Sequence, residues 1–323
     1  MPDRPGDSAK DLAVVADIGG TNTRVALARG PVVDAESIAR YRNADHGGLT
    51  GVLSDYLAQH NAAPVAACVA MAGPVRDGVG RLTNLDWTVD RESVARATGA
   101  ATVAVLNDLQ AQGHAVDHLS AAHLTRILPG RAAAEHAAKL VIGVGTGLNA
   151  APVFRLGGQT LVPPSESGHV SLPAQDADDL ALRDWLVATH GSAGAEEALS
   201  GRGFERIHAF LCARDGGTPR DAAGIMAAHA AGDAQATRAM EIFATLLGRV
   251  AGNLALTLLP FGGIYLCGGV ARHFGPHLVP LGFAEGFRDK GRFAGFMDQF
   301  GVELVTDDYA ALTGSAAHLA ELA

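Results

Sequence analysis

The chain has 323 residues, of which 48% are hydrophobic, and a formal net charge of -9. This length allows two domains, each with its own apolar core. The 34 acidic residues outnumber the 25 basic ones, which works against nonspecific binding to nucleic acid or to anionic membranes. Its three cysteines, Cys68, Cys212 and Cys267, are far apart and form no C-x-x-C pair. We therefore expect a globular protein of a reducing, cytoplasmic compartment.

The first third of the chain alternates predicted strands and helices. Residues 1–11 form a polar tail without the apolar stretch of a secretion signal. Apolar runs predict strands near residues 12–17, 23–29, 65–71 and 102–106. Helical patterns follow near residues 48–60, 90–98 and 108–117. The stretch 117–138, which is rich in Ala and His and contains Pro129-Gly130, is expected to be a hinge region.

From residue 140 the strand signal returns, and residues 176–259 are then mostly helical. An uncharged segment, residues 250–271, reaches the length of a membrane span, about 20 residues. Pro260 and Gly262-Gly263 interrupt it. This favours a buried helix, a turn and a buried strand instead. The elements expected here are a helix over 244–259, a strand over 264–267, a helix from about 271, a strand near 302–305 and a terminal helix over 309–322 that crosses back to the first domain.

Two glycine-rich turns each follow an apolar strand. The first is Asp17-Ile18-Gly19-Gly20-Thr21-Asn22, and the second is Gly143-Val144-Gly145-Thr146-Gly147-Leu148-Asn149. Each leads into a second strand, which suggests one strand-turn-strand unit used twice, with backbone N–H groups offered to phosphate oxygens. Asp17 would suit Mg²⁺, which carboxylates usually hold through water. Taken alone, the first turn is equally compatible with an ordinary hairpin.

Common nucleotide-binding motifs are missing. The chain has no G-x-x-x-x-G-K-[ST] loop, no G-x-G-x-x-G fingerprint and no H-R-D loop. Any phosphate site must therefore be of another type.

Polar residues follow other predicted strands and loops. Asn107 and Asp108 come directly after the strand 102–106, at the end where open α/β sheets place ligands. Further on, Glu166 and His169 lie in the loop Ser165-Glu-Ser-Gly-His169, and Glu196 precedes Glu197. Carboxylates, a carboxamide and an imidazole together suit a ligand with many hydroxyl groups.

In order and spacing, these motifs resemble those of bacterial glucokinases of the hexokinase type, in the sugar kinase, Hsp70 and actin superfamily. Residues 17–22 are similar to the first phosphate motif, 143–148 to the second, and Tyr265-Leu-Cys-Gly268-Gly269-Val270 to the adenosine motif. The resemblance extends over nearly the whole chain. It implies an α/β, two-lobed, actin-like fold, a duplicated ribonuclease H-like arrangement with a mixed sheet in each lobe and a cleft between the lobes. The expected domains are 1–116 plus 308–323, and 117–307.

The resemblance also implies an activity and its residues. The expected reaction transfers the γ-phosphoryl group of ATP, with Mg²⁺, to the 6-hydroxyl of glucose, in a homodimer. Asp108 would be the catalytic base. The expected sugar ligands are Asn84, Asn107, Asp108, Glu166, His169 and Glu196. The expected nucleotide-binding residues are Asp17, Ile18, Gly19, Gly20, Thr21, Asn22, Gly145, Thr146, Gly147, Gly268 and Gly269, with Asp17 also at the metal.

Simpler roles remain open for several of these residues. Asp108 is also a good helix N-cap, and Glu166 alone would usually be a solvated loop residue. Glu197 can serve as the sugar ligand in place of Glu196. For Asn84 a sugar-binding role and a structural role are about equally favoured, and Trp87 can simply be a packing residue. For His114, His118 and His123, a solvated helical face is favoured over a metal site, because no carboxylate or cysteine set accompanies them.

Three positions depart from the family pattern. Asn149 stands where a small residue, often glycine, is usual, and Ser165 and Ser167 flank Glu166 where glycine is frequent. These changes remove no expected ligand. The chain also has neither the cysteine-rich zinc motif nor the N-terminal DNA-binding domain found in the related repressor-kinase group.

Other functions are compatible with parts of this pattern. A glycosidase would show paired carboxylates but needs no nucleotide loops, and only 5% of the residues are aromatic. A non-catalytic, sugar-sensing regulator would keep the sugar pocket but would not need Asp108. A chaperone-like or actin-like ATPase would keep the glycine turns without the sugar ligands. Mannose and fructose remain alternative substrates, since the contrast between glucose and mannose rests on one hydroxyl.

Overall fold

The computed structural model describes residues 12–82 and 85–322, which form two compact units. Unit 1 comprises Met1–Ser120, Arg155–Pro164 and Asp307–Ala323. Unit 2 comprises Ala121–Phe154 and Ser165–Thr306.

These boundaries differ from the expected ones at one place in particular. The segment Arg155–Pro164, expected in the second domain, belongs to unit 1. Glu321 near the end of the chain explains this, because its carboxylate accepts hydrogen bonds from the Thr160 N–H at 2.8 Å and the Thr160 hydroxyl at 2.7 Å. The Arg155 guanidinium also lies 3.4 Å from the Glu321 carboxylate. Such long-range side-chain pairs leave no local signal in the sequence.

Unit 1 is built on a mixed sheet with the strand order β3-β2-β1-β5-β9, in which β4 also pairs with β2. β1 is antiparallel to β2, whereas β1, β5 and β9 are parallel. The strands are β1 (Leu12–Ile18), β2 (Asn22–Arg29), β3 (Val32–Val33), β4 (Ala39–Arg42), β5 (Ala66–Met71) and β9 (Thr102–Asn107). A small antiparallel sheet adds β6 (Val75–Arg76), β7 (Val79–Arg81) and β8 (Thr88–Asp90).

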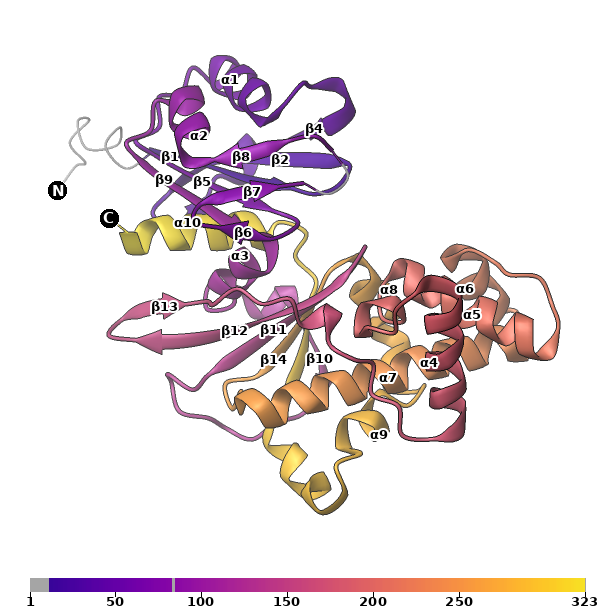
Figure 1. Cartoon of the computed structure of the whole chain (residues 1–323). Coiled ribbons are helices and arrows are strands. Elements are labelled where there is room, and N and C mark those ends of the chain that lie inside the picture. Colours follow the sequence, from indigo (N-terminus) through magenta and orange to yellow (C-terminus); the bar gives the residue numbers. More distant parts are fainter. Residues whose placement is uncertain (1–11, 83–84, 323) are drawn as a thin grey trace. The chain divides into compact units, whose positions relative to one another are not determined.

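Helices cover both faces of the unit 1 sheet. Alternate residues of β1 face opposite sides: Val14 and Ala16 pack into one apolar cluster with α1 and α2, and Val15 packs into another with α3 and α10. These four helices are α1 (Leu49–His60), α2 (Arg91–Thr98), α3 (Asp108–Ala115) and α10 (Ala310–Leu322) (Figure 1). The expected return of the terminal helix to the first domain is confirmed.

Unit 2 repeats this sheet. Its strand order is β10-β15-β14-β11-β12-β13. β11 is antiparallel to β12 and parallel to β14, which is parallel to β15, so β12-β11-β14-β15 matches β2-β1-β5-β9 in order and direction. The strands are β10 (Leu124–Leu128), β11 (Lys139–Val144), β12 (Leu148–Leu156), β13 (Gln159–Leu161), β14 (Ile264–Cys267) and β15 (Val302–Val305). The sequence-based prediction of one strand-turn-strand unit used twice is therefore confirmed.

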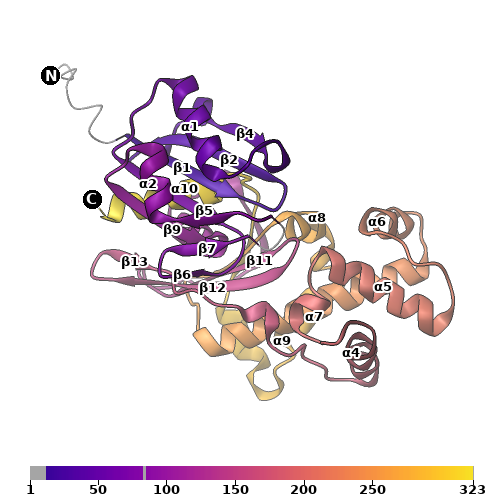
Figure 2. The ribbon, with the colours of Figure 1, turned by 45° about the horizontal axis from the view of Figure 1, so that its top comes forward.

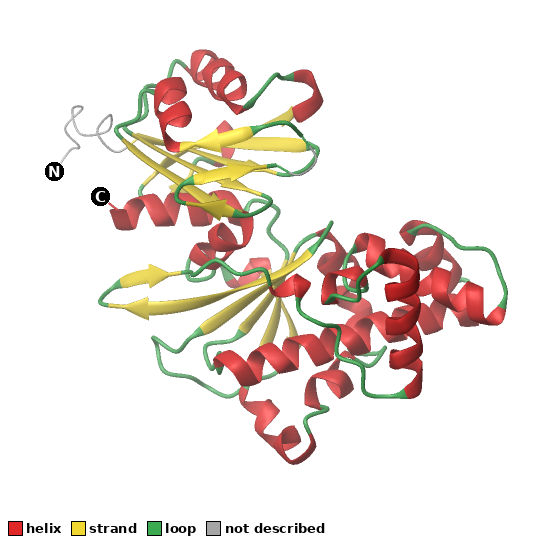
Figure 3. Ribbon diagram, in the orientation of Figure 1, coloured by secondary structure: helices red, strands yellow, loops and turns green. Residues whose placement is uncertain are grey.

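Unit 2 is richer in helix than unit 1, and α4, α5 and α6 gather to one side of its sheet (Figures 1 and 2). The helices are α4 (Ala177–His190), α5 (Gly201–Asp215), α6 (Ala222–Ala230), α7 (Ala234–Leu258), α8 (Gly269–Leu278) and α9 (Phe283–Arg288). Short 3₁₀ segments complete the chain: η1 (Ala35–Ser37), η2 (Asn43–Asp45), η3 (Ala121–His123), η4 (Ser167–His169), η5 (Ala195–Glu197) and η6 (Gly291–Gln299). Figure 3 shows how strands and helices share each unit.

Two predicted elements need correction. The helix expected over 244–259 is the second half of the longer α7, which begins at Ala234 after the N-cap Asp233. By length and composition α7 qualifies as a membrane span, yet 72% of its apolar window is buried inside the fold, as in a core helix. The expected hinge, 117–138, contains the edge strand β10, which pairs antiparallel with β15. Ala-rich and His-rich composition hid this strand.

Candidate active site

The first glycine turn and Asp108 share one edge of the unit 1 sheet. In the parallel part of this sheet, Ile18, Met71 and Asn107 lie side by side in register at the carboxyl ends of β1, β5 and β9. The turn follows β1 and Asp108 follows β9, so they are two strand spacings apart, or about 10 Å. This edge is where open α/β sheets bind ligands.

The first glycine turn is held by a buried asparagine. The Gly19 N–H donates to the Asn22 carbonyl at 3.0 Å, which closes the turn. Asn43 donates its side-chain N–H to the Gly19 carbonyl at 2.8 Å and accepts the Thr23 hydroxyl, also at 2.8 Å. Gly20 and Thr21 at the tip are exposed, so the tip is accessible to a ligand. Asn43 could not be predicted from the sequence, because it is 24 residues from Gly19 and lies in no motif.

Asp17 at the end of β1 is a partly buried carboxylate with one cationic neighbour. Its cross-strand partner in register is Arg24, whose guanidinium lies 3.1 Å from the carboxylate. Burial raises the pKa of Asp17, and Arg24 partly opposes this. A further cation close to Asp17 would stabilise its ionised form.

The residues near Asp17 fit a magnesium ion that is held mainly by the phosphates of a bound substrate. In the described part of the chain, no three His, Cys, Asp or Glu side chains gather in a group that could hold a metal. Mg²⁺ keeps several waters and is often bound through one or two carboxylates plus substrate phosphates. A single carboxylate beside a glycine turn is compatible with that mode.

Asn107 and Asp108 begin α3 in different roles. Asn107 is the N-cap: its side-chain oxygen accepts the Leu109 N–H at 2.9 Å, and its side-chain N–H donates to the Gly73 carbonyl at 2.9 Å. The alternative in which Asp108 is the cap is therefore wrong. Asp108 is the first residue of the helix and is half-buried, with one carboxylate oxygen accepting the Leu109 N–H at 2.9 Å. The Asn107 oxygen also accepts the Gln110 N–H in a capping box, so the buried amide keeps one N–H for another partner.

In unit 2, the second glycine turn and the pair Gly268-Gly269 also share one sheet edge. Gly143 at the end of β11 pairs in parallel with Cys267 at the end of β14. Gly268 has φ +98°, and a Cβ there would clash with the Val144 carbonyl, so only glycine fits at this position. Gly145 and Gly269 face open space, since a Cβ at either would meet nothing within 4 Å. This edge therefore offers unscreened backbone next to the N-terminus of α8, as a phosphate requires.

Glu196 lies against the second glycine turn, and Glu197 does not. The Glu196 carboxylate accepts the Leu148 N–H at 2.9 Å, and a Cβ on Gly147 would clash with the same oxygen. Glu197 instead forms an ion pair with Arg206. The structure thus separates the two candidates and places Glu196 at the turn.

Glu166 is the N-cap of η4 and His169 is its last residue, and this segment lies beside Glu196. Gly168, between them, packs so closely on β12 that a Cβ would clash with the Leu148 carbonyl, and it would lie 3.5 Å from the Glu196 Cβ. The side chains of Glu166 and His169 are exposed. The three expected sugar ligands of unit 2 therefore surround the first residues of β12.

Three other expectations have different outcomes. Asn84 lies outside the described residues. Trp87 is only 6% exposed and belongs to the apolar core of unit 1, which agrees with a packing role. The solvated helical face expected for His114 is wrong: it is 5% exposed, because α10 covers it and brings His318 to a ring distance of 4.4 Å.

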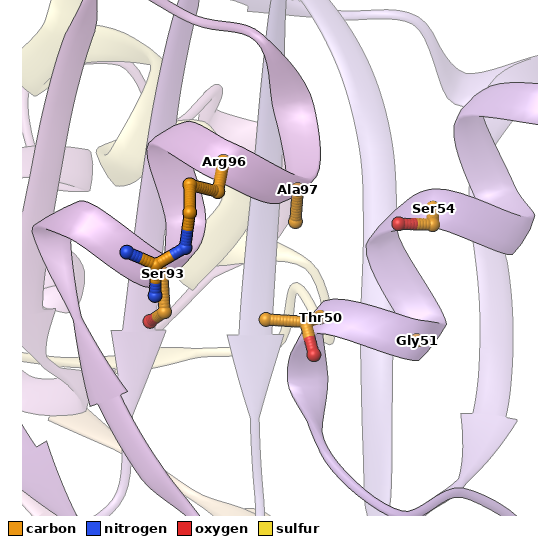
Figure 4. Close-up of a pocket in the computed structure, with 6 residues that line it drawn as sticks. All are labelled: Thr50, Gly51, Ser54, Ser93, Arg96 and Ala97. Atoms are coloured by element: carbon orange, nitrogen blue, oxygen red, sulfur yellow. The ribbon is translucent and has the colours of Figure 1, made fainter.

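A shallow hollow within unit 1 contains no expected site residue. It lies between α1 and α2 and is lined by Thr50, Gly51, Ser54, Ser93, Arg96 and Ala97 (Figure 4). Its one cation, Arg96, pairs with Glu92 one turn earlier. It has no feature that links it to the glycine turns.

Known proteins resemble this chain over nearly its full length. The family model described as Glucokinase matches residues 14–322. A glucokinase from Pseudomonas paraeruginosa is 38% identical over 324 residues, covering 98% of this chain and 94% of that protein. The crystal structure of a glucokinase from an Antarctic psychrotroph is 33% identical, with a TM-score of 0.85, covering 96% of this chain and 99% of that one. A glucokinase of the ROK family from Streptomyces griseus, solved with glucose and AMPPNP, is 18% identical with a TM-score of 0.64, covering 97% of this chain and 100% of that one. The actin-like fold of the sugar kinases is thereby confirmed, and the chain belongs to the glucokinase family.

Proposed function

We propose that this protein is an ATP-dependent glucokinase, which transfers the γ-phosphoryl group of ATP to the 6-hydroxyl of glucose and releases glucose 6-phosphate and ADP. In addition to the family match, the observation that carries this proposal is the position of Asp108. It lies at the carboxyl end of β9, on the same sheet edge as the first glycine turn. A regulator that only binds sugar has no need of a general base at this position.

Asp108 is proposed as the general base. Its carboxylate would accept the proton of the 6-hydroxyl as the oxygen attacks phosphorus, a role typically worth ~10²–10⁴ in rate. Asn107 fixes the start of α3, so it orients Asp108 as well as offering its own amide to the sugar. Positioning is the larger part of phosphoryl transfer, because the protein does little covalent chemistry itself.

The other sugar ligands are proposed from unit 2 and from residue 84. Glu166, His169 and Glu196 would bind the remaining hydroxyls, together with Asn84. Glu196 is held by the Leu148 N–H, which leaves its second oxygen for a hydroxyl group. Each such bond restricts the rotation of the ring and so orients the 6-hydroxyl.

The nucleotide is proposed to bind through the two glycine turns and the adenosine motif. The residues are Asp17, Ile18, Gly19, Gly20, Thr21 and Asn22, with Gly145, Thr146, Gly147, Gly268 and Gly269. When bound beside Asp17, Mg²⁺ would offset the charge of the phosphates. The Streptomyces griseus glucokinase binds AMPPNP, an ATP analogue, which supports ATP as the donor here. We further propose a homodimer that acts in the cytoplasm, where its free thiols stay reduced.

A coupled phosphorylation assay tests this function. Wild-type protein should phosphorylate glucose faster than mannose, fructose or N-acetylglucosamine. The substitution Asp108→Asn should lower kcat by ~10²–10⁴ while glucose still binds, as measured by calorimetry. The matched control is Asp55→Asn, an exposed carboxylate on α1 that should leave kcat unchanged. Full activity of Asp108→Asn would remove this mechanism, and glucose binding without ATP consumption in the wild type would favour the sugar-sensing regulator.

A further inference from the structure

Three residues that were expected from the sequence to differ from the family pattern, Asn149, Ser165 and Ser167, contact one another. Asn149 is the second residue of β12 and pairs with Gly143 of β11 across the sheet. Its side-chain N–H donates to the Ser165 carbonyl at 2.6 Å. Its side-chain oxygen accepts the Ser167 N–H at 3.0 Å. One amide therefore holds the backbone on both sides of Glu166.

The two serine hydroxyls strengthen the same contact. The Ser167 hydroxyl lies 3.3 Å from the Asn149 side-chain oxygen. The Ser165 hydroxyl donates to the Ala150 carbonyl at 2.6 Å and lies 3.4 Å from the same Asn149 oxygen. Glycines at these positions would provide none of these bonds and would leave the loop more freedom. Asn149, Ser165 and Ser167 therefore form one hydrogen-bonded set, which we call the Asn149 clamp.

The clamp connects two expected sugar ligands to one strand. Leu148, the residue before Asn149, donates its N–H to Glu196 at 2.9 Å. Consecutive residues of β12 thus fix Glu196 and the Glu166 loop, and β12 is itself fixed by its pairing with β11. Glu166 is exposed, so neighbouring side chains do not pack it into place. Its position depends on the backbone on either side, which the clamp sets.

We propose that Asn149 is a positioning residue for the sugar, which orders the Glu166 and His169 loop before glucose binds. This inference rests on the proposed function, because it takes Glu166 as a sugar ligand. Ordering the loop in advance reduces the entropy that binding would otherwise cost. The expected result of losing the clamp is weaker sugar binding, with little change in the chemical step.

Asn149→Ala tests the proposal. We expect KM for glucose and the calorimetric Kd for glucose to rise about tenfold, with kcat and KM for ATP changed by less than about threefold. A merely structural role would change thermal stability and both KM values together. Gln175→Ala, which removes an exposed amide from the same unit, is the matched control and should leave both KM values unchanged.

A second variant addresses the clamp from its other side and leaves β12 untouched. Ser167→Ala should raise KM for glucose by about threefold in the wild-type background, because the Ser167 hydroxyl lies 3.3 Å from the Asn149 side-chain oxygen. In the Asn149→Ala background the same substitution should have little further effect, because that oxygen is gone. This non-additivity is the signature of one connected set.

The outcomes separate the inference from the function. Wild-type activity on glucose together with unchanged glucose KM and Kd in Asn149→Ala would overturn the inference alone. Additive effects of the serine and asparagine substitutions would also overturn it. Wild-type protein that neither binds nor phosphorylates glucose would overturn the proposed function and this inference with it.

Discussion

At the scale of single residues, glycines around the second turn do different things. A Cβ on Gly147 would displace Glu196, and one on Gly168 would clash with the backbone of β12. Gly145 is different, because nothing lies within 4 Å of the position that its Cβ would take. Packing therefore does not require glycine at position 145. A ligand that approaches the backbone closely would require a glycine there.

Gly145→Ala separates these explanations. Because the added methyl group meets no protein atom, the melting temperature should stay within about 2 °C of the wild type. If phosphate approaches this backbone, KM for ATP should rise about tenfold or more, while KM for glucose stays unchanged. Steady-state kinetics and thermal unfolding measure the two effects. Gly295→Ala, at another open position of unit 2, is the control. An unchanged KM for ATP would mean that Gly145 does not face the nucleotide.

At the scale of elements, long apolar runs were predictable and short edge strands were not. Runs such as Leu12–Ile18 and Lys139–Val144 identified the strands that carry both glycine turns. Strands of two or three residues, including β3 and β6, show no periodicity that a sequence can reveal. The existence of a strand or helix could therefore be predicted wherever the element was long enough to show a repeating apolar pattern.

For the candidate site as well, some residues could be predicted from the sequence and others could not. Asp108, Glu166 and Glu196 could be proposed from the sequence because they lie in motifs next to predicted elements. Asn43 and the clamp role of Asn149 were not, because each depends on hydrogen bonds between segments distant in sequence. The choice of Glu196 over Glu197 also needed the structure, which shows that Glu197 is paired with Arg206.

The contact between α3 and α10 is a further example, and it has a consequence for pH. A Cβ on Gly314 of α10 would clash with the Ala111 carbonyl of α3, so the two helices approach closely. His114 and His318 meet in this contact. Burial, with smaller contributions from His318 and His118, lowers the pKa of His114 to about 3, and burial also lowers the pKa of His318. The His114 ring is buried, with its Nδ1 lacking a hydrogen-bond partner.

Unit 1 should therefore lose stability in mild acid. The folded state keeps His114 neutral, whereas the unfolded chain binds a proton below its ordinary pKa of 6.5, so stability falls as pH drops from 6.5 towards 3. The loss is about 1.4 kcal/mol per pH unit for His114, or roughly 2 kcal/mol at pH 5. His114→Gln should flatten this dependence, measured by urea unfolding at pH 7 and pH 5. His136→Gln, an exposed histidine, should not. Equal slopes for wild type and His114→Gln would show that His114 is not the group responsible.

At the scale of the whole molecule, the two units repeat one sheet, and each unit carries part of the proposed active-site residues. Each unit carries a glycine turn between an antiparallel pair of strands, β1 and β2 or β11 and β12. The proposed base, Asp108, is in unit 1, whereas the proposed sugar ligands Glu166, His169 and Glu196 are in unit 2. The proposed chemistry therefore needs both units in one chain, although each has its own core.

The thiols give a test of the whole fold. Cys68, Cys212 and Cys267 form no disulfide and are all buried, and they are distributed over both units. Burial raises the pKa of Cys68 to about 12, so its thiolate, the reactive form, is scarce at neutral pH. In the native protein, dithionitrobenzoate should therefore react with less than about one thiol per chain within minutes. After unfolding in urea it should titrate all 3 free cysteines. Glucose with an ATP analogue should slow the native reaction further, because binding lowers the population of open states. Rapid native reaction at more than one thiol would show that at least one core opens readily, contrary to the burial of all three.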